Sequence, residues 1–479
     1  MTHTGPWKTA DVTEGDVNLT DSRRDWMTEH VDRETREWLE RDARVFLHQS
    51  LSTPCLNVLA SCRNASLEDL QGRRFLDFHG NSVHQVGFGN PRVVEAVKEQ
   101  LDALSFCPRR YTNRPAVMLA ERLARLAPGN LAKVLFAPGG TTAVGMALKL
   151  ARVATGRFKT ISMWGSFHGA SLDAISVGGE ALFRSGIGPL LPGAEHVPPA
   201  EPYRCLWDLE GRCETCGLKC ASYIEYVMER EGDVAAVIAE PLRCTSVHLP
   251  PRGYWQAVRQ ACDRHGALLI FDETAVCLGR TGRMFACEHF GVVPDILVLG
   301  KGLGGGIMPL AAIVAREDLD VAGDKALGHY THEKNPVACA AGLAALEIFE
   351  EEGAVERAAH LGEGCLEALT ERREVLPLVG DVRGIGLLLA VELVLDGRTK
   401  ERAVQATERV MYECLSRGLS FKVSNGNCIV LTPPLTISQR DLERALRILV
   451  EVLAEVTQED HPATFPLDRA GHEEGMRCG

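Results

Sequence analysis

Short apolar runs that alternate with helical patterns constrain this chain more than any other feature of its sequence. The runs are KVLFA (133–137), KTISMW (159–164), VAAVIAEP (234–241), ALLIFDE (267–273) and DILVLGK (295–301). A strand that helices cover on both faces has no polar alternation, because neither face meets water. Strands separated by helices usually pair in parallel. The sequence therefore predicts an α/β domain around a mostly parallel sheet.

The chain of 479 residues is too long for one hydrophobic core and is divided here into four segments. Residues 1–65 are an N-terminal part of the small domain, with a flexible start of about 25 residues and then a helix around 32–46. Residues 66–345 are the large domain, and a long helix over 338–353 leads out of it. Residues 346–460 are a smaller α+β domain containing the strand-like runs GIGLLLAVELVL and NCIVLTPPLTI, and residues 461–479 are a tail.

Composition excludes several classes of protein. The net charge of −12 argues against a nucleic-acid-binding surface. No apolar run reaches the roughly 18 residues of a membrane helix, and the polar N-terminus has no secretory h-region. Sixteen cysteines without such a signal favour reduced thiols. We therefore expect a cytoplasmic protein with no membrane or nucleic-acid partner.

One lysine, Lys301, stands at the end of the last apolar run and directly before the glycine-rich stretch GLGGG. A buried amine is costly to keep charged, so it tends to be neutral and nucleophilic or to be paired. Such lysines form Schiff bases with carbonyl compounds, pyridoxal phosphate (PLP) among them. Taken alone, a lysine at a strand end more often reaches into solvent, so the rest of the chain has to separate the two interpretations.

The loop in LFAPGGTTAVGMALKLAR leads from a strand through Gly139, Gly140, Thr141 and Thr142 into a helix. Glycines let the backbone approach an anion, and the first free N–H groups of a helix point at it. A plain helix N-cap after a glycine turn is the alternative. Together with Lys301, the loop favours a phosphate site.

Two further elements carry groups that suit a planar cofactor. Asp272 ends an apolar strand, where a buried carboxylate needs a cation. A protonated pyridine nitrogen would supply that cation and make the ring an electron sink, although a structural arginine would also serve. In MWGSFHGAS, Phe167 could stack on the ring with His168 beside it, or it could belong to the core.

These elements resemble the class III PLP-dependent aminotransferase family. The resemblance covers roughly residues 50–455 and also includes GRTG at 279–282 and NPVACAAGLAALE at 335–347. It implies fold type I, with a mostly parallel seven-stranded sheet flanked by helices in the large domain and a smaller α+β domain. It also implies PLP as cofactor and a homodimer with active sites shared at the subunit interface.

The resemblance implies a role for each matching residue around the ring. Lys301 would form the Schiff base and move the proton between carbon centres, and Asp272 would hold the pyridine nitrogen. Phe167 would stack on one face of the ring, with His168 beside it. Thr274 would pack near the other face, where the family more often has Val or Ile.

Around the phosphate, Gly140 and Thr141 would bind the cofactor of their own subunit. Thr331, in HYTHEKNP, matches the threonine that reaches the phosphate of the neighbouring subunit's cofactor. These three residues complete the cofactor contacts that the resemblance implies.

The departures from the family concern the residues that grip carboxylates. Members that use 2-oxoglutarate usually have an arginine directly after FHG, where this chain has Ala170. In EPLRCTSV, Thr245 replaces the family's gating glutamate and Arg243 replaces a glutamine. Val430 stands where the family has its C-terminal arginine. Arginine grips carboxylates best, so its joint loss makes transamination with 2-oxoglutarate the less expected activity.

Elimination is the expected activity, because it needs no keto acid. Several loops, such as DFHGNSVHQVGFGNP and FCPRRYTN, resemble those of family members that release ammonia from a hydroxylated aminoethylphosphonate. Lys301 would remove a proton beside the amine of (R)-1-hydroxy-2-aminoethylphosphonate, and water and then ammonia would leave to give phosphonoacetaldehyde. The alternatives are an ω-aminotransferase with an acceptor such as pyruvate, a phospho-lyase acting on phosphorylated amino alcohols, and a non-catalytic scaffold.

Other groups would be needed to bind such a substrate. The dianionic phosphonate needs cations, for which Arg243 is the first candidate, followed by Arg109, Arg110 and Lys422. A surface salt bridge is the alternative for each of them. His84 or His168 could assist the departure of hydroxide, although a structural role is the alternative for both.

Four cysteines form the pattern C-x7-C-x2-C-x3-C at Cys205, Cys213, Cys216 and Cys220. Four thiols could bind zinc or an iron–sulfur cluster. The spacing matches no standard module, however, and the expected chemistry needs no metal, so no metal site is predicted.

Overall fold

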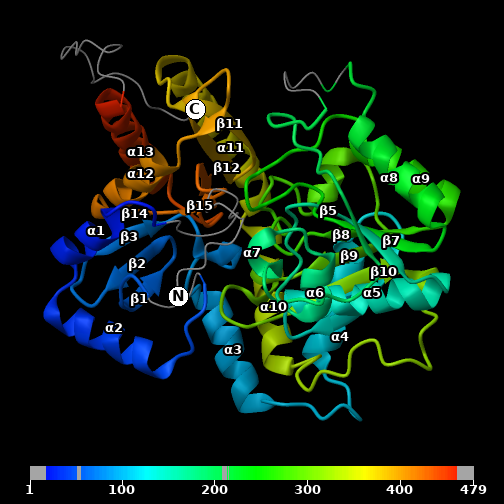
Figure 1. Cartoon of the computed structure of the whole chain (residues 1–479). Helices are drawn as coiled ribbons and strands as arrows, with labels where there is room; N and C mark the ends of the chain where they lie inside the picture. The colour runs from blue at the N-terminus through cyan, green and yellow to red at the C-terminus, as the bar shows by residue number, and fades with distance from the viewer. Residues whose placement is uncertain (1–17, 51–54, 208–212, 214, 461–479) are drawn as a thin grey trace. The chain divides into compact units, whose positions relative to one another are not determined.

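The structure is a computed structural model and describes residues 18–50, 55–207, 213 and 215–460 (Figure 1). It divides into two compact units, one of residues 81–359 and one that joins the segments on either side of it. The sequence had suggested divisions at 65/66 and 345/346, whereas the units meet at 80/81 and 359/360. Strands within 66–77 pair in a sheet of the smaller unit, and helix α10 (Pro336–Glu351) packs on helices of the larger one. The predicted tail, 461–479, lies outside the described residues.

A seven-stranded sheet in the order β4-β10-β9-β8-β7-β5-β6 is the centre of the larger unit. Its strands are β4 (Leu131–Ala137), β5 (Lys159–Met163), β6 (Ala194–Val197), β7 (Val234–Ala239), β8 (Leu268–Asp272), β9 (Ile296–Leu299) and β10 (Ala311–Arg316). Strands β5 to β9 pair in parallel, and β10 runs antiparallel between β4 and β9. The predicted mostly parallel seven-stranded sheet is confirmed, and each of the five apolar runs is a strand.

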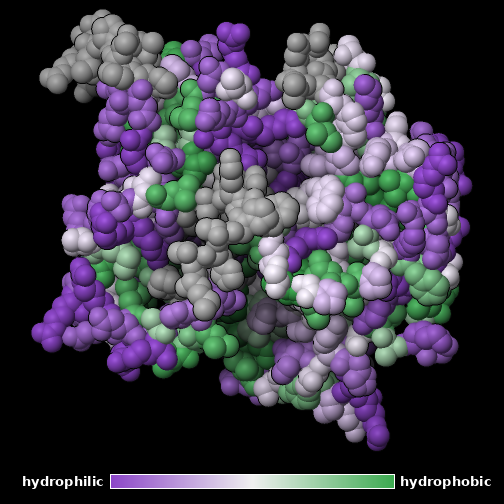
Figure 2. Space-filling view, in the orientation of Figure 1, coloured by the Kyte–Doolittle hydropathy of each residue, from purple (hydrophilic) through white to green (hydrophobic). Residues whose placement is uncertain are grey.

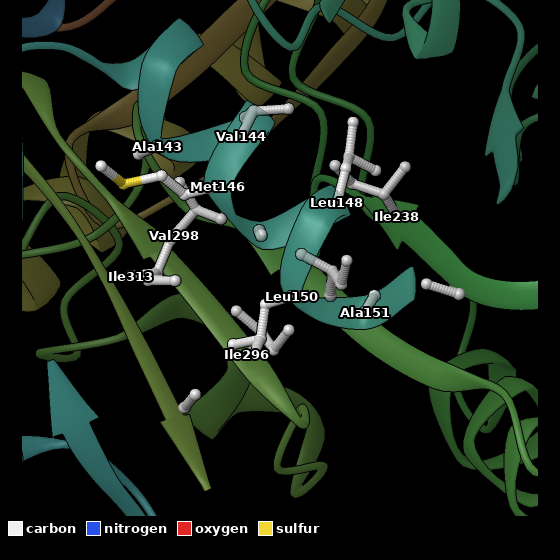
Figure 3. Packing of buried hydrophobic residues seen from close by; sticks show 14 of the residues in the cluster. Ala143, Val144, Met146, Leu148, Leu150, Ala151, Ile238, Ile296, Val298 and Ile313 are labelled. Carbon is white, nitrogen blue, oxygen red and sulfur yellow. The ribbon is translucent and has the colours of Figure 1, made fainter. Parts of the chain in front are cut away.

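Helices cover this sheet on both faces, which explains why its strands have no polar alternation. Helix α5 (Gly140–Thr155) contacts β7, β8, β9 and β10, and Met146 and Leu150 share a hydrophobic cluster with Ile296 and Val298 (Figure 3). On the opposite face, Phe271 packs edge-on against Trp255 of α9 (Tyr254–His265), with ring centroids 4.6 Å apart. Figure 1 shows α5 and α6 (Leu172–Val177) on one side of these strands and α8 (Lys219–Glu231) and α9 on the other.

Three further helices of the larger unit pack at the end of the sheet that carries β4. Helix α10 packs on α3 (Pro91–Ala103) and α4 (Arg114–Leu126), and α4 packs on β4. Each of these three helices begins with an asparagine whose side chain accepts a backbone N–H of the first turn, followed by Pro or Arg-Pro. This N-cap chemistry fixes where each helix starts. A short helix, α7 (Ala181–Arg184), follows α6.

Among its described residues, the smaller unit contains two sheets and four helices beside helix α11 (Ala354–Val375), which spans the division at 359/360. One sheet is β1 (Leu59–Arg63), β2 (Ser66–Asp69), β3 (Arg74–Asp77) and β14 (Leu419–Ser420); the other is β11 (Val379–Ile385), β12 (Leu388–Asp396), β16 (Cys428–Leu431) and β15 (Lys422–Ser424), with β13 (Glu401–Arg402) paired to β12. The helices are α1 (Ser22–His30), α2 (Arg33–Val45), α12 (Val404–Ser416) and α13 (Gln439–Asp460).

The two halves of this unit come from opposite ends of the chain and are joined by specific contacts. Strand β3 pairs in parallel with β14, and the backbone N–H of Leu19 donates to Glu408 Oε2 at 2.7 Å. The helix predicted around 32–46 is confirmed as α2. Helix α1 begins at Ser22, inside the stretch that the sequence had suggested to be flexible.

Hydrophilic side chains predominate on the face of the molecule drawn in Figure 2, and the hydrophobic areas between them are small. Within the described residues, every helix is too short or too polar to cross a bilayer.

Candidate active site

Four neighbouring strands of the parallel sheet bring site residues to one edge. Phe167 and His168 follow β5, Glu240 follows β7, Asp272 ends β8 and Lys301 follows β9. These strands are adjacent in the sheet, and parallel strands present their carboxyl ends at the same edge, where α/β proteins bind ligands. Residues far apart in the sequence therefore converge on one side of the larger unit.

Asp272 is buried and held by three hydrogen bonds. His168 Nδ1 donates to its Oδ2 at 2.9 Å, and the backbone N–H and hydroxyl of Thr274 donate to its Oδ1 at 3.1 and 2.6 Å. Burial alone raises the pKa of this carboxyl, but His168 and the Thr274 donors more than offset it and hold the pKa below its usual value. Asp272 is therefore an anion, as holding a protonated ring nitrogen requires.

His168 lies behind Asp272 and is itself buried. Burial lowers its pKa, but the hydrogen bond and charge of Asp272, with Glu240 and Glu180 nearby, raise the pKa above its ordinary value. The ring is thus an imidazolium paired with a carboxylate. Its Nε2 has no hydrogen-bond partner among the described residues, and nothing in these contacts supports the suggested role in hydroxide departure.

Thr274 connects the glycine loop, the lysine turn and the buried carboxylate. A Cβ on Gly140 would lie 3.0 Å from Thr274 Cγ2, and a Cβ on Gly300, directly before Lys301, would lie 2.9 Å from the same methyl group. Both positions are too crowded for a larger residue without movement of Thr274. Its hydroxyl meanwhile binds Asp272. One side chain thus holds three of the predicted motifs against one another.

The glycine loop ends at the N-terminus of α5. Gly139 is its N-cap, and the first intrahelical bond runs from Ala143 N–H to Gly139 O. The N–H groups of residues 140–142 are therefore free of helical partners and can bind an anion. Thr141 Oγ1 lies 2.9 Å from Ser171 Oγ, which draws the segment after FHG onto the loop.

Lys301 adopts a left-handed backbone conformation, with φ 45°. For a residue other than glycine, this conformation costs about 1–2 kcal/mol and is concentrated at functional sites. The side chain is half-buried, and its amine makes no hydrogen bond or ion pair with a described residue. The lysine is thus held in a strained turn with its amine available for reaction.

The structure separates the residues predicted to bind substrate. Arg243 lies close to the site, but its Nη1 donates to Glu201 Oε1 at 2.7 Å. Arg109 bonds the carbonyl oxygen of Tyr330 at 3.0 Å and pairs with Glu333 at 3.3 Å. The substrate roles of these arginines stay predictions, and in this structure other groups already occupy both side chains.

The other predicted residues lie outside the group at the strand ends. Arg110 and Thr331 are exposed on loops of the larger unit, and Lys422 lies in β15 of the smaller unit. His84 is buried in the larger unit and stacks on Phe88, with ring centroids 4.6 Å apart. The predicted role of each stays a prediction.

Sequence reasoning missed Glu240. It stands in EPLRCTSV directly after β7, and its Oε1 and Oε2 accept the backbone N–H groups of Phe167 and Cys244 at 3.2 and 3.1 Å. Burial raises the pKa of Glu240, while His168 and Arg243 lower it in part. A carboxylate at the end of an apolar strand was the signal used for Asp272, and it would have found Glu240 too.

No metal was predicted, and two groups bear on that expectation. Burial raises the pKa of Cys220 to about 11, with smaller contributions from the three other cysteines of its pattern. Elsewhere, Glu225, Glu229 and His265 place ligand atoms within 4.8 Å of one another. Arg264 binds both oxygens of Glu225 at 2.7 and 2.8 Å and already neutralises it.

The residues at the strand ends fit PLP. The α5 N-terminus suits its phosphate, the anionic Asp272 suits its ring nitrogen, and the unpaired amine of Lys301 suits its aldehyde. A mostly parallel seven-stranded sheet with these three groups at one edge defines a PLP-dependent enzyme of fold type I.

Comparison with known proteins agrees with this assignment. Residues 49–453 match the family model for class III aminotransferases. The chain is 47% identical over 93% of its length to (R)-1-hydroxy-2-aminoethylphosphonate ammonia-lyase of Vibrio splendidus, covering 96% of that protein. It is 36% identical over 88% of its length to leucine/methionine racemase of Thermococcus litoralis, again covering 96% of that protein.

Among solved structures, an aminotransferase of Bacillus anthracis aligns with a TM-score of 0.82 at 31% identity, over 88% of this chain and 99% of the other. A PLP-bound amine transaminase from an uncultivated Pseudomonas species aligns with a TM-score of 0.79 at 32% identity, over 87% and 98%. The chain belongs to the class III aminotransferase family, and its cofactor is PLP.

Proposed function

We propose that this enzyme is a lyase that converts (R)-1-hydroxy-2-aminoethylphosphonate into phosphonoacetaldehyde and ammonia. The observation that carries the proposal is the 47% identity to an ammonia-lyase of that name over nearly the whole chain. The absence of two carboxylate-binding arginines adds support. Ala170 and Val430 stand where acceptor-binding arginines are expected, and Val430 is buried in β16, where it can bind no carboxylate.

In the proposed reaction, PLP supplies an electron sink for the carbon that bears the amine. The amine of Lys301 takes the proton from that carbon. The carbon–oxygen bond of the neighbouring carbon breaks, and the oxygen leaves as water once it has gained a proton. The resulting enamine takes up one water and gives phosphonoacetaldehyde and ammonia, so the reaction consumes no keto acid.

Asp272 and Thr274 have distinct tasks in this scheme. Asp272 keeps its negative charge beside the ring nitrogen, because His168 and Thr274 lower its pKa. The methyl group of Thr274 leaves no room for a side chain at position 300, where a Cβ would come within 2.9 Å of it, and so restricts the turn that carries Lys301. The amine and the carboxylate are thereby fixed by one framework before substrate arrives.

Ammonia release without any keto acid tests the proposal. The holoenzyme is mixed with the (R) and (S) forms of the hydroxylated aminoethylphosphonate, with phosphoethanolamine and with β-alanine, and ammonia is measured over many turnovers. We expect continuous release from the (R) compound alone. A reaction that stops after one product molecule per active site would contradict the proposal. So would release of phosphate from phosphoethanolamine at a higher rate than release of ammonia from the (R) compound.

Transamination is the second candidate, because the aligned structures are aminotransferases at 31% and 32% identity. Adding pyruvate to the same assay separates the two activities. A transaminase would form alanine and turn over only when pyruvate is present, whereas the lyase would be indifferent to it.

We further propose that the enzyme is a homodimer in which Thr331 reaches the phosphate of the neighbouring subunit's cofactor. Thr331 is exposed on the surface of its own chain, which leaves it accessible to a second copy. Sedimentation of the holoenzyme, compared with Thr331→Ala, tests this: the mass should be that of two chains, and the variant should bind PLP more weakly. A monomeric holoenzyme would refute it.

A further inference from the structure

Arg243 lies directly beneath the turn that carries Phe167 and His168. A Cβ on Gly165 would come within 2.5 Å of Arg243 Nη1 and 2.8 Å of its Cζ. Gly165 also has φ +75°, which side chains rarely adopt. The glycine is therefore required for two reasons, and one of them is the guanidinium below it.

Carboxylates hold this guanidinium on two sides. Its Nη1 donates to Glu201 Oε1 at 2.7 Å, and its Nη2 lies 3.7 Å from Glu180 Oε1. Its Nε donates to Thr245 Oγ1 at 3.0 Å. The side chain is only 12% exposed, so little of it is left to meet a substrate. Its Nη1 and Nε bond the protein's own groups, and its buried Nη2 has no hydrogen-bond partner among the described residues.

One partner of Arg243, Glu180, is itself tied to the turn. The carbonyl oxygen of Ser166 accepts the backbone N–H groups of Gly179 and Glu180 at 2.8 and 3.3 Å. Glu240 accepts the backbone N–H of Phe167 at 3.2 Å. Without Arg243, buried Glu180 would lose a nearby cation, so the 179–180 segment that bonds Ser166 would be destabilised. Glu201 would lose its ion pair.

The same cation also acts on the charge balance behind the ring. Arg243 and His168 both favour the ionised form of Glu240, and Glu180 and Glu240 both favour the imidazolium of His168. His168 in turn supports Asp272. Arg243 is thus the second cation of a buried network whose other end is the carboxylate that faces the cofactor.

We propose that Arg243 is a positioning residue for the cofactor site, which holds the 165–168 turn and so places Phe167 against the ring and His168 on Asp272. This replaces the interpretation of Arg243 as the ligand of the phosphonate. The proposal concerns the support of PLP and does not depend on which substrate the enzyme uses.

The test compares Arg243→Met and Arg243→Lys with the wild-type chain. PLP is titrated into apoprotein and followed by its absorbance, and kcat and KM are measured on the aminophosphonate. We expect the dissociation constant for PLP to rise about tenfold in Arg243→Met, the order expected for loss of a charged hydrogen bond, and to recover in part in Arg243→Lys. The KM should stay within about twofold of wild type at saturating PLP.

Two outcomes would overturn the proposal. One is unchanged PLP affinity with a KM raised tenfold or more, which would make Arg243 a substrate ligand. The other is unchanged PLP affinity with a lower Tm alone, which would make it a structural residue with no effect on the site. If the enzyme proves to use another substrate, the PLP titration still decides the matter.

Two further variants keep the test sharp. Should Arg243→Met fail to fold, Glu201→Gln removes the charge of its closest partner and should weaken PLP binding in the same direction by a smaller factor. Arg264→Met is the matched control: it also breaks an arginine–glutamate pair, with Glu225 on the surface, and should leave PLP affinity unchanged. Equal effects of Arg264→Met and Arg243→Met would refute the proposal.

Discussion

Asp272 and Glu240 stand at the ends of adjacent strands and both act on His168, yet their pKa values move in opposite directions. Burial raises both, but Asp272 accepts a hydroxyl, a backbone N–H and an imidazolium, and its pKa falls. Glu240 accepts two backbone N–H groups and has its cations farther away, and its pKa rises. The hydrogen-bond donors, rather than the depth of burial, decide which of the two carboxylates keeps its charge.

The largest expected effect comes from removing each charge in turn. Asp272→Asn should lower kcat/KM for ammonia release by about 10³-fold, because the ring nitrogen loses its anionic partner. Glu240→Gln keeps a hydrogen-bond acceptor for Phe167 N–H and should cost about tenfold or less. Rates and cofactor absorbance are measured on both holoenzymes. Equal losses would mean that the two carboxylates share one role, against the contrast drawn here.

The free energy of unfolding should distinguish a buried charged histidine from a neutral one. His168→Phe leaves Asp272 without its imidazolium and should lower the free energy of unfolding of the apoprotein by about 3 kcal/mol. His196 is a suitable control, because its pKa is lowered to about 4 and it carries no charge to lose. Urea unfolding should therefore show a smaller loss, about 1 kcal/mol, for His196→Phe. A larger loss at His196 would argue against the buried ion pair.

The pH dependence of that loss has a definite sign. Asp272 has a depressed pKa, so its contribution to stability is present above its ordinary value of 3.8 and disappears as the pH falls through the folded value. His168 has a raised pKa, so its contribution is complete below 6.5 and disappears as the pH rises through the folded value. The stability difference between wild type and His168→Phe should be largest between these limits. A difference that grows above pH 7 would contradict the pairing.

Glu240 should behave in the opposite sense to Asp272. Its pKa is raised, so folding takes up a proton there, and its contribution to stability falls as the pH rises above its ordinary value of 4.5. Glu240→Gln cannot titrate and should flatten that part of the wild-type curve. Unfolding measured in urea at closely spaced pH values detects the change in slope, and an unchanged slope would show that Glu240 is ionised in the folded state.

The smallest effect is expected at Thr274. Thr274→Val keeps the methyl contact with Gly140 and Gly300 and loses the hydrogen bond to Asp272, so activity should fall about fivefold, equivalent to about 1 kcal/mol. Thr274→Ser makes the complementary change, keeping the hydroxyl and losing the methyl group. Kinetics and PLP titration of the pair separate the two tasks. Activity unchanged in Thr274→Val would show that His168 and the backbone N–H of residue 274 sustain the charge of Asp272 without the hydroxyl.

The sequence predicted the positions of Lys301 and Asp272 better than it predicted the residues that contact them. Each of the two follows or ends an apolar run, and the structure places both at the ends of strands. The direction of β10 was not predicted, because an antiparallel strand buried on both faces is as apolar as a parallel one. The divisions between the units were displaced because pairing of β3 with β14 depends on residues far along the chain.

Arg243 illustrates the same limit at the level of a side chain. Its position beside the site follows from β7, but its partners Glu180 and Glu201 come from two other segments. Sequence spacing says nothing about which loops meet, so a basic residue near a predicted anion site was assigned to the substrate. The contacts that argue for another role exist only in the folded molecule.

The bond from Arg243 to Thr245 also bears on how this scaffold can be re-engineered. Restoring the family's glutamate at position 245 would place a third acid against a guanidinium that already holds Glu180 and Glu201. The new glutamate would compete with Glu180 and Glu201 for Arg243 instead of controlling how a keto-acid acceptor binds. A library that aims to recover a transaminase from this chain therefore has to vary positions 243 and 245 together.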